Sequence, residues 1–166
     1  MTEEKPEKIR KQFVIVKTLI VNKEDEVLFV RRKKEDLKQA HNKWEFPGGK
    51  IDFGEYPEQT AVREAKEESG YDIKVDFLLP KILSLKWESP EREAQQILIC
   101  YVCSLLGGKS TIPDHGVSEI KWFRLDKSPK DKDCLPGTID FLNIYKKVIQ
   151  KEELKESFPN TQNATI

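Results

Sequence analysis

Three glutamates near the middle of the chain are spaced so that a helix would gather their carboxylates. Glu64, Glu67 and Glu68 stand at positions i, i+3 and i+4, and residues at this spacing emerge on one helix face. Like charges placed in this way destabilise a helix by about 0.2–0.5 kcal/mol per pair. Glu67 and Glu68 also fall in the last turn before Gly70, where the helix dipole disfavours anions. Two local preferences are therefore violated in one turn, which is typical of a functional site whose charge is compensated by a partner.

A hard divalent cation is one partner that would compensate these charges. Carboxylate oxygens are the ligands that Mg²⁺ and Mn²⁺ prefer, and binding of the ion removes the repulsion between them. The alternative is a solvated acidic helix face whose charge is relieved by Arg63 and Lys66. The E-x-x-E-E spacing alone favours this alternative, because charge runs usually serve solubility. The residues around the glutamates therefore have to decide between the two.

The surrounding segment, residues 49–71, resembles the signature of the Nudix hydrolases. That signature is G-x5-E-x7-R-E-U-x-E-E-x-G-U, in which U is a bulky apolar residue. Ala65 and Tyr71 occupy two U positions, and all seven fixed positions match: Gly49, Glu55, Arg63, Glu64, Glu67, Glu68 and Gly70. The resemblance implies an α/β fold, the Nudix-type α/β/α sandwich, with a mixed β-sheet between helices in a single domain.

The same resemblance implies a metal site and a reaction. The implied Mg²⁺ ligands, with Mn²⁺ as an alternative ion, are the backbone carbonyl of Gly49 and the carboxylates of Glu64, Glu67 and Glu68. A metal-activated water would attack a phosphorus of a diphosphate linked to some group X, and Glu64 or Glu67 would take the proton of that water. Some family members use a base from a later loop. Asp114 and Glu119 are the candidates for such a base here. For each of them, an ordinary surface carboxylate is the favoured interpretation.

Two further residues of the signature carry structural roles by the same resemblance. Glu55 and Arg63 are expected to tie the loop to the helix, because the guanidinium fork can hold a carboxylate through two hydrogen bonds. Gly49 suits a place where the backbone closely approaches an ion or phosphate. Gly70 is expected to end the helix.

Residues 42–59 resemble the MutT-type branch of the family, which removes oxidised guanine nucleotides. Arg32 aligns with an arginine that this branch uses near the substrate, and Lys50 is placed to meet a phosphate as a point charge. A solvated charge run is the alternative for Arg32. The favoured substrate is a nucleoside triphosphate, oxidised or not, cleaved to the monophosphate and pyrophosphate. The alternatives are hydrolysis of ADP-ribose, a nucleotide sugar or a dinucleoside polyphosphate, and a non-catalytic nucleotide-binding module.

The expected base pocket departs from the MutT branch. That branch places a base-reading asparagine just before its last helix, whereas residues 135–140 contain none. Thr138 or Asp140 could read a base there, with a different hydrogen-bond pattern. Phe53 and Trp87 are candidates for stacking on a base, and burial in the core is the alternative for both.

Composition excludes several other classes of protein. The 166 residues suit one domain, and 29 basic against 29 acidic residues remove the simplest electrostatic case for a nucleic-acid or membrane binder. No apolar run approaches the roughly 18–20 residues that span a bilayer, and the charged first residues are unlike a secretory signal.

The odd number of cysteines suits a reducing cytoplasm. Cys100 and Cys103 are expected to point to opposite faces of one strand as buried structural thiols. A homodimer is possible, but the sequence identifies no interface for one.

The pattern of apolar runs and breakers predicts the elements that position these residues. We expect a charged leader at 1–11, a Nudix domain at 12–155 and a polar tail at 156–166. Within the domain, a hairpin is predicted at 13–21 and 27–30, and strands at 44–46, 71–87 with a break at Pro80, 95–106 and 120–125. Helices are predicted at 57–69 and about 138–154. Pro47-Gly48-Gly49 is expected to form a loop, and Gly107-Gly108 a turn.

Overall fold

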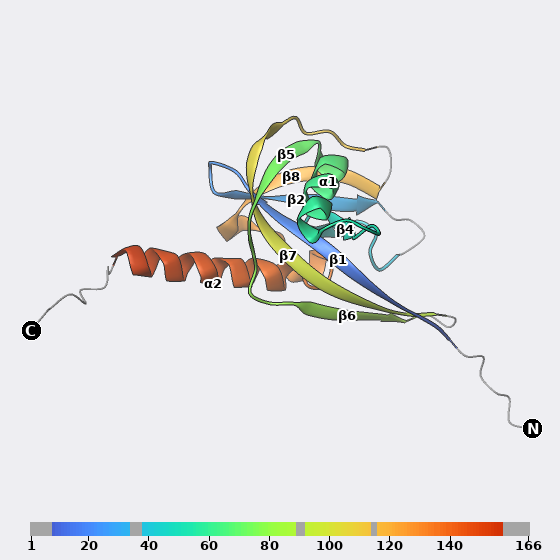
Figure 1. Cartoon of the computed structure of the whole chain (residues 1–166). Coiled ribbons are helices and arrows are strands. Elements are labelled where there is room, and N and C mark those ends of the chain that lie inside the picture. Colours follow the sequence, from blue (N-terminus) through green and yellow to red (C-terminus); the bar gives the residue numbers. More distant parts are fainter. Residues whose placement is uncertain (1–7, 34–37, 89–91, 114–115, 158–166) are drawn as a thin grey trace, which may run out of the picture.

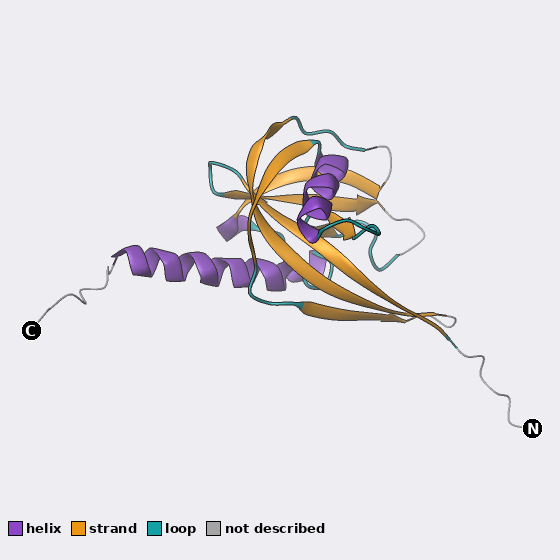
Figure 2. Ribbon diagram, viewed as in Figure 1, coloured by secondary structure: helices purple, strands orange, loops and turns teal. Residues whose placement is uncertain are grey.

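The computed structural model describes residues 8–33, 38–88, 92–113 and 116–157, which form an eight-stranded mixed sheet packed between helices (Figure 1). The strands are β1 (Ile9–Val21), β2 (Glu26–Lys33), β3 (Trp44–Glu45), β4 (Gly48–Lys50), β5 (Tyr71–Leu78), β6 (Leu83–Glu88), β7 (Arg92–Gly108) and β8 (Gly116–Arg124). The helices are α1 (Pro57–Ser69) and α2 (Thr138–Ser157), preceded by 3₁₀ turns at Leu125–Lys127 and Asp131–Asp133. The predicted α/β sandwich with a mixed sheet is confirmed, and Figure 2 shows the sheet between α1 and α2.

Two long parallel strands form the centre of the sheet. β1 and β7 pair in register from Ile9 with Arg92 to Val21 with Ser104, and the other strand pairings of the described residues are antiparallel. The order is β3-β2-β1-β7-β5, while β4 pairs with β1, β6 with β7 and β8 with β2. The predicted β1–β2 hairpin is therefore confirmed.

Alternation along β1 and β7 divides the core into two layers. Val16 and Ile20 pack with Ala61 and Ala65 of α1, whereas Ile15 and Leu19 share a cluster with α2. Cys103 belongs to the first cluster and Cys100 to the second. The two thiols thus point to opposite faces, as predicted, and both are buried.

The boundaries of three predicted elements were wrong because pairing partners lie far away in the sequence. β1 begins at Ile9, inside the expected leader, because residues 9–12 pair with residues 92–95. The expected Pro47-Gly48-Gly49 loop overlaps β4, which pairs with β1. A Cβ on Gly48 would lie 2.0 Å from the carbonyl oxygen of Val16. Gly107 and Gly108 continue β7 instead of turning, because they pair with Asp72 and Tyr71.

Helix α1 has the predicted limits, since its start and end signals are local. Pro57 occupies the first turn, the Tyr56 N–H donates to the Gln59 side chain at 2.8 Å, and Gly70 caps the end at φ 78°. Its buried residues are mostly small, so the helix lies close to the sheet. At about 100° per residue, Glu68 lies about 20° from the buried Ala61 and Glu67 about 120° from it. The helix therefore turns Glu68 inward and Glu67 outward.

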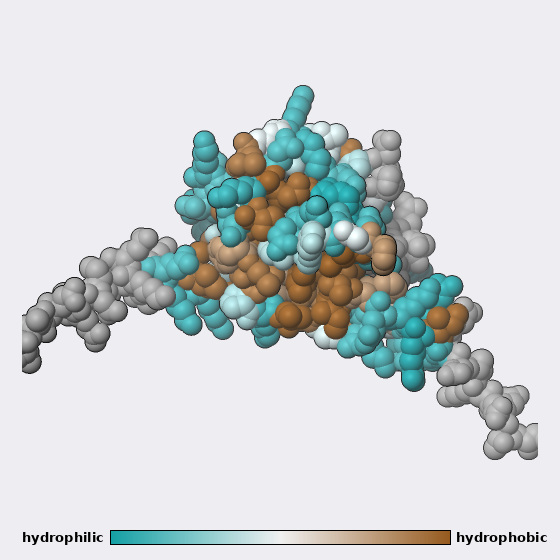
Figure 3. All heavy atoms as spheres, viewed as in Figure 1, coloured by the Kyte–Doolittle hydropathy of each residue, from teal (hydrophilic) through white to brown (hydrophobic). Residues whose placement is uncertain are grey.

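The face of the molecule shown in Figure 3 carries both hydrophilic and apolar areas. Figure 3 shows hydrophilic side chains over much of the α1 region and apolar side chains gathered below it, over β7 and β1. No helix in the described residues combines the length and apolar character needed to cross a membrane.

Candidate active site

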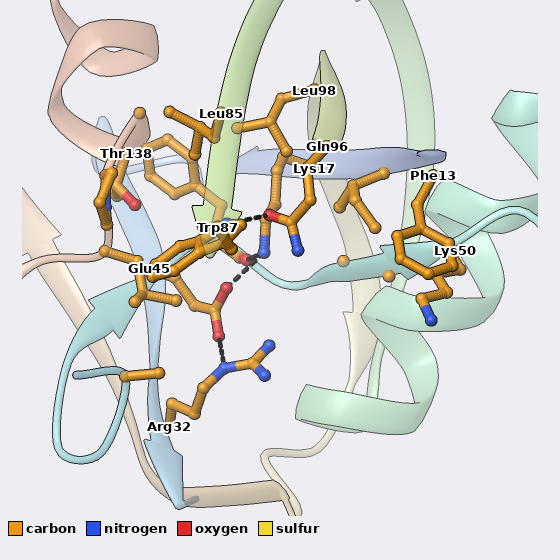
Figure 4. A pocket seen from close by; sticks show the side chains of 18 of the residues that line it. Phe13, Lys17, Arg32, Glu45, Lys50, Leu85, Trp87, Gln96, Leu98 and Thr138 are labelled. Atoms are coloured by element: carbon orange, nitrogen blue, oxygen red, sulfur yellow. Dashed lines mark hydrogen bonds and ion pairs between the residues drawn. The ribbon is translucent and has the colours of Figure 1, made fainter. Parts of the chain in front are cut away.

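A cavity of about 880 Å³ lies beside the inward-facing side of α1. Residues from six strands, both helices and the segment before α2 line it. Figure 4 shows Arg32 and Glu45 on one side and Leu85 and Leu98 on the opposite side, with Trp87 between them. The cavity therefore has a charged end and a largely apolar end, as a site for an amphipathic small molecule requires.

The structure brings Gly49, Glu64 and Glu68 together at the charged end. The Gly48 N–H donates to the Glu68 carboxylate at 2.9 Å. A Cβ on Gly49 would lie 2.2 Å from Glu64 Oε1, so any larger residue would require this carboxylate to move. Glu67 is 58% exposed, accepts from Arg63 Nη1 at 3.3 Å and does not line the cavity.

Burial of Glu68 makes its charge costly. Its pKa is raised to about 7, mainly by burial and next by the negative charge of Glu45, whereas Lys17 and the Gly48 N–H act against the shift. Within the described part of the chain, no group of three or more His, Cys, Asp or Glu side chains is arranged to hold a metal ion. The oxygen donors that do converge fit Mg²⁺, because this ion is commonly bound by one or two carboxylates together with substrate phosphates and water.

Glu55 and Arg63 meet as the predicted structural pair requires. Arg63 donates from Nε to Glu55 Oε1 at 2.9 Å and from Nη2 to Glu55 Oε2 at 3.0 Å. The Arg63 side chain also donates to the Lys50 carbonyl at 3.2 Å and to Glu64 at 2.7 Å. The hydrogen bonds from Arg63 and Thr60 hold the pKa of Glu55 at about 2. The Arg63 side chain therefore joins the loop after β4 to the acidic face of α1.

A buried ion cluster of Glu45, Lys17 and Arg32 lies under the charged end, and sequence reasoning missed two of its three members. Glu45 is 2% exposed and forms ion pairs with Lys17 of β1 and Arg32 of β2. Burial alone would raise the pKa of Glu45, but the two cations outweigh it and hold the pKa below its ordinary value. The sequence feature that could have indicated this burial is the position of Glu45 between two aromatic residues, Trp44 and Phe46, in a short strand before Pro47.

The two residues predicted to bind substrate both line the cavity. Arg32 uses Nε for Glu45, and its terminal nitrogens make no hydrogen bond with any side chain or carbonyl of the described residues. The charge of Glu45 first, and those of Glu68 and Glu64 after it, raise the pKa of Arg32. The Lys50 ammonium lies at the rim, 3.8 Å from the ring centre of Phe13.

The remaining candidates separate clearly. Trp87 and the 5%-exposed Thr138 line the cavity, while Asp140 is exposed and does not. Phe53 is fully exposed, so core burial was wrong for it. Glu119 pairs with Arg31 at 3.2 Å outside the cavity lining. Asp114 lies outside the described residues.

A family model described as the NUDIX domain matches residues 11–139. The chain belongs to the Nudix family. It is 44% identical over 73 residues to an 8-oxo-dGTP diphosphatase of Escherichia coli, an alignment covering 44% of this chain and 54% of that protein. It is 32% identical over 115 residues to an ADP-ribose pyrophosphatase of Methanocaldococcus jannaschii, covering 67% and 62%. The chain thus spans little more than half the length of these curated Nudix relatives.

Solved Nudix structures share the fold. A NUDIX hydrolase from Nitrosomonas europaea superimposes with a TM-score of 0.69 at 20% identity, over 83% of this chain and 90% of that one. A MutT NUDIX hydrolase from Burkholderia pseudomallei gives 0.64 at 22% identity, over 80% and 97%. These matches establish the Nudix architecture on which the cavity is built.

Removing the buried charge of Glu45 should destabilise this Nudix protein strongly. Glu45→Gln keeps the size of the side chain but leaves Lys17 and Arg32 without their counter-ion, and breaking a buried pair in this way costs about 3 kcal/mol of unfolding free energy. Urea unfolding measures the loss. The control Glu119→Gln removes an exposed pair with Arg31 and should cost less than about 1 kcal/mol. Equal stabilities of the two variants would contradict the buried cluster.

Neutralising Glu68 should stabilise the metal-free protein, and only at neutral to alkaline pH. Because folding raises the pKa of Glu68 from 4.5 to about 7, its protonated form favours the native state, and this stability is lost as the pH rises through that window. In EDTA, Glu68→Gln should therefore exceed wild type by about 3 kcal/mol at pH 8 and by little at pH 5. The matched control is Glu67→Gln on the exposed side of α1. A gain for Glu68→Gln that does not depend on pH would contradict the burial of this carboxylate.

Proposed function

We propose that the protein is a Mg²⁺-dependent hydrolase that cleaves a nucleoside triphosphate to the monophosphate and pyrophosphate. The observation that carries the proposal is one cavity in which two α1 carboxylates, the cations of the ion cluster and an aromatic wall converge. Support also comes from Nudix relatives whose names, 8-oxo-dGTP diphosphatase and ADP-ribose pyrophosphatase, both denote cleavage of a diphosphate.

The metal would be held by Glu64, Glu68 and the backbone carbonyl of Gly49, with Mn²⁺ as an alternative ion. Glu67, included by its place in the signature, would have to release Arg63 to join them. When bound, the ion lowers the pKa of water and neutralises phosphate charge. The carboxylate of Glu64 or Glu67 then receives the proton of the attacking water.

The cations of this chain would bind and orient the diphosphate. The terminal nitrogens of Arg32 suit two-point contact with phosphate oxygens, while Lys17 and Lys50 supply point charges. Arg63 holds the Lys50 carbonyl and Glu64 in one framework, so it fixes the distance between the loop and the acidic helix. Its structural role therefore serves the geometry of the reaction.

The apolar end of the cavity supports a nucleoside as the group beyond the diphosphate. Trp87, Leu85 and Leu98 line it and offer an aromatic face and apolar surface to a planar base. The ADP-ribose alternative rests on the archaeal relative and would use the same acidic helix. The three buried free thiols and the balanced charge support action on small molecules in the cytoplasm, without nucleic acid or membrane as partner.

A hydrolysis screen with products identified by mass tests the proposal. The panel holds ordinary and oxidised nucleoside triphosphates, ADP-ribose, nucleotide sugars and dinucleoside polyphosphates. We expect a triphosphate to be cleaved fastest, with pyrophosphate as product and with activity lost in EDTA. Preference for ADP-ribose would replace the proposed substrate but keep the diphosphate chemistry, and binding without turnover of any compound would contradict an enzyme.

Variants in the same assay separate metal binding from folding. Glu64→Gln and Glu68→Gln should each lower kcat by at least about 100-fold, and calorimetry should show weakened Mn²⁺ binding. Glu119→Gln, outside the cavity, should retain activity. Wild-type turnover by either α1 variant at saturating Mg²⁺ would contradict the assigned metal site.

A further inference from the structure

The side chains of Trp87 and Gln96 form a hydrogen-bonded pair on the wall of the cavity. They lie on adjacent strands, because Trp87 of β6 is opposite Ala94 of β7 and Gln96 is its diagonal neighbour on the same face. Trp87 Nε1 donates to Gln96 Oε1 at 3.0 Å. An indole N–H can only donate, so this bond decides which end of the Gln96 amide faces Trp87.

The consequence is that the NH₂ group of Gln96 is presented to the cavity. Figure 4 shows the amide nitrogen turned away from Trp87, and this nitrogen has no hydrogen-bond partner among the described residues. Leu85 and Leu98 flank the pair in the cavity lining, so a base bound against these side chains would displace water from the Gln96 amide. The wall thus offers a hydrogen-bond donor beside apolar side chains.

A second donor comes from the start of α2. Thr138 lines the same cavity, is 5% exposed, and its hydroxyl makes no hydrogen bond to another described residue. A hydroxyl adapts to either kind of partner, whereas the fixed amide of Gln96 does not. Discrimination between ligands therefore lies with Gln96, and its direction is controlled by Trp87.

We propose that the Trp87–Gln96 pair selects nucleotides whose base carries a carbonyl oxygen at C6 of a purine or C4 of a pyrimidine, as guanine, hypoxanthine, uracil and thymine do, where adenine and cytosine carry an amino group. This inference rests on the proposed function, in that it names the substrates of the same cavity. The amide NH₂ donates to the base carbonyl, whereas the amino group of adenine or cytosine would set donor against donor. Gln96 is the specificity-determining residue and Trp87 the positioning residue that prevents the amide from rotating.

Matched pairs of substrates test the selection. ITP and ATP, and likewise UTP and CTP, differ mainly in a carbonyl or an amino group. The value of kcat/KM should favour the first of each pair by about 10–100-fold, because a mismatched base would cover the Gln96 donor without pairing it. Trp87→Phe keeps an aromatic ring but removes the N–H, so the Gln96 amide can rotate. The kcat/KM values of the two nucleotides in each pair should then differ by less than about threefold. Gln96→Leu should reduce turnover of the carbonyl bases and leave the amino bases little changed.

The control variant is Gln95→Leu, because Gln95 bonds Gln12 and Ser84 away from the cavity lining; its substrate ratios should equal those of wild type. No preference in the wild type, or an unchanged ratio in Trp87→Phe, would overturn the selection. Binding of IMP and AMP, measured by calorimetry, reports the same preference without turnover. If the protein prefers IMP but hydrolyses no nucleotide, the proposed function is wrong. If it shows no preference for IMP over AMP, the selection by the Trp87–Gln96 pair is wrong.

Discussion

The ion cluster of Glu45 with Lys17 and Arg32 is the interaction on which the charged end of the cavity depends. It joins three neighbouring strands, β1, β2 and β3, at the place where β4 and α1 also arrive. A buried ion pair is weak evidence for stability, since apolar residues of similar size often serve the fold as well. Its value here is that one carboxylate holds two cations facing an acidic helix.

Charge balance explains why the site suits a metal and a diphosphate together. Glu68 lies near Glu45 and Glu64, and the negative charge of each raises its pKa in addition to burial. Arg32 leaves its terminal nitrogens unused toward the same space. A divalent cation relieves the carboxylates, and a diphosphate satisfies the cations, so each ligand improves the electrostatic fit of the other.

The parts of the structure that local sequence governs could be predicted. Helix α1 begins at Pro57 and ends before Gly70 as expected, because a helix start and a left-handed cap are local events. The Glu55–Arg63 contact also followed from one short motif. Helical periodicity also predicts that Glu68 points inward and Glu67 outward. The expectation that all three glutamates share one face overlooked this difference.

The parts that depend on pairing between distant segments could not be predicted. The first residues of β1 are strand only because β7, some 80 residues later, lies beside them. Glu45 is a buried ion-cluster member only because β1 and β2 bring Lys17 and Arg32 to it. The same is true of Gln96, whose amide is oriented by Trp87 across two strands.

A crystal structure with Mg²⁺ and a triphosphate analogue, in which a methylene replaces the oxygen between the α and β phosphorus atoms, tests the central claim most directly. We predict the ion at Glu64, Glu68 and the Gly49 carbonyl, the diphosphate against Arg32 and the base against Trp87. Phosphates bound elsewhere, or an ion bound away from Glu64 and Glu68, would contradict this account.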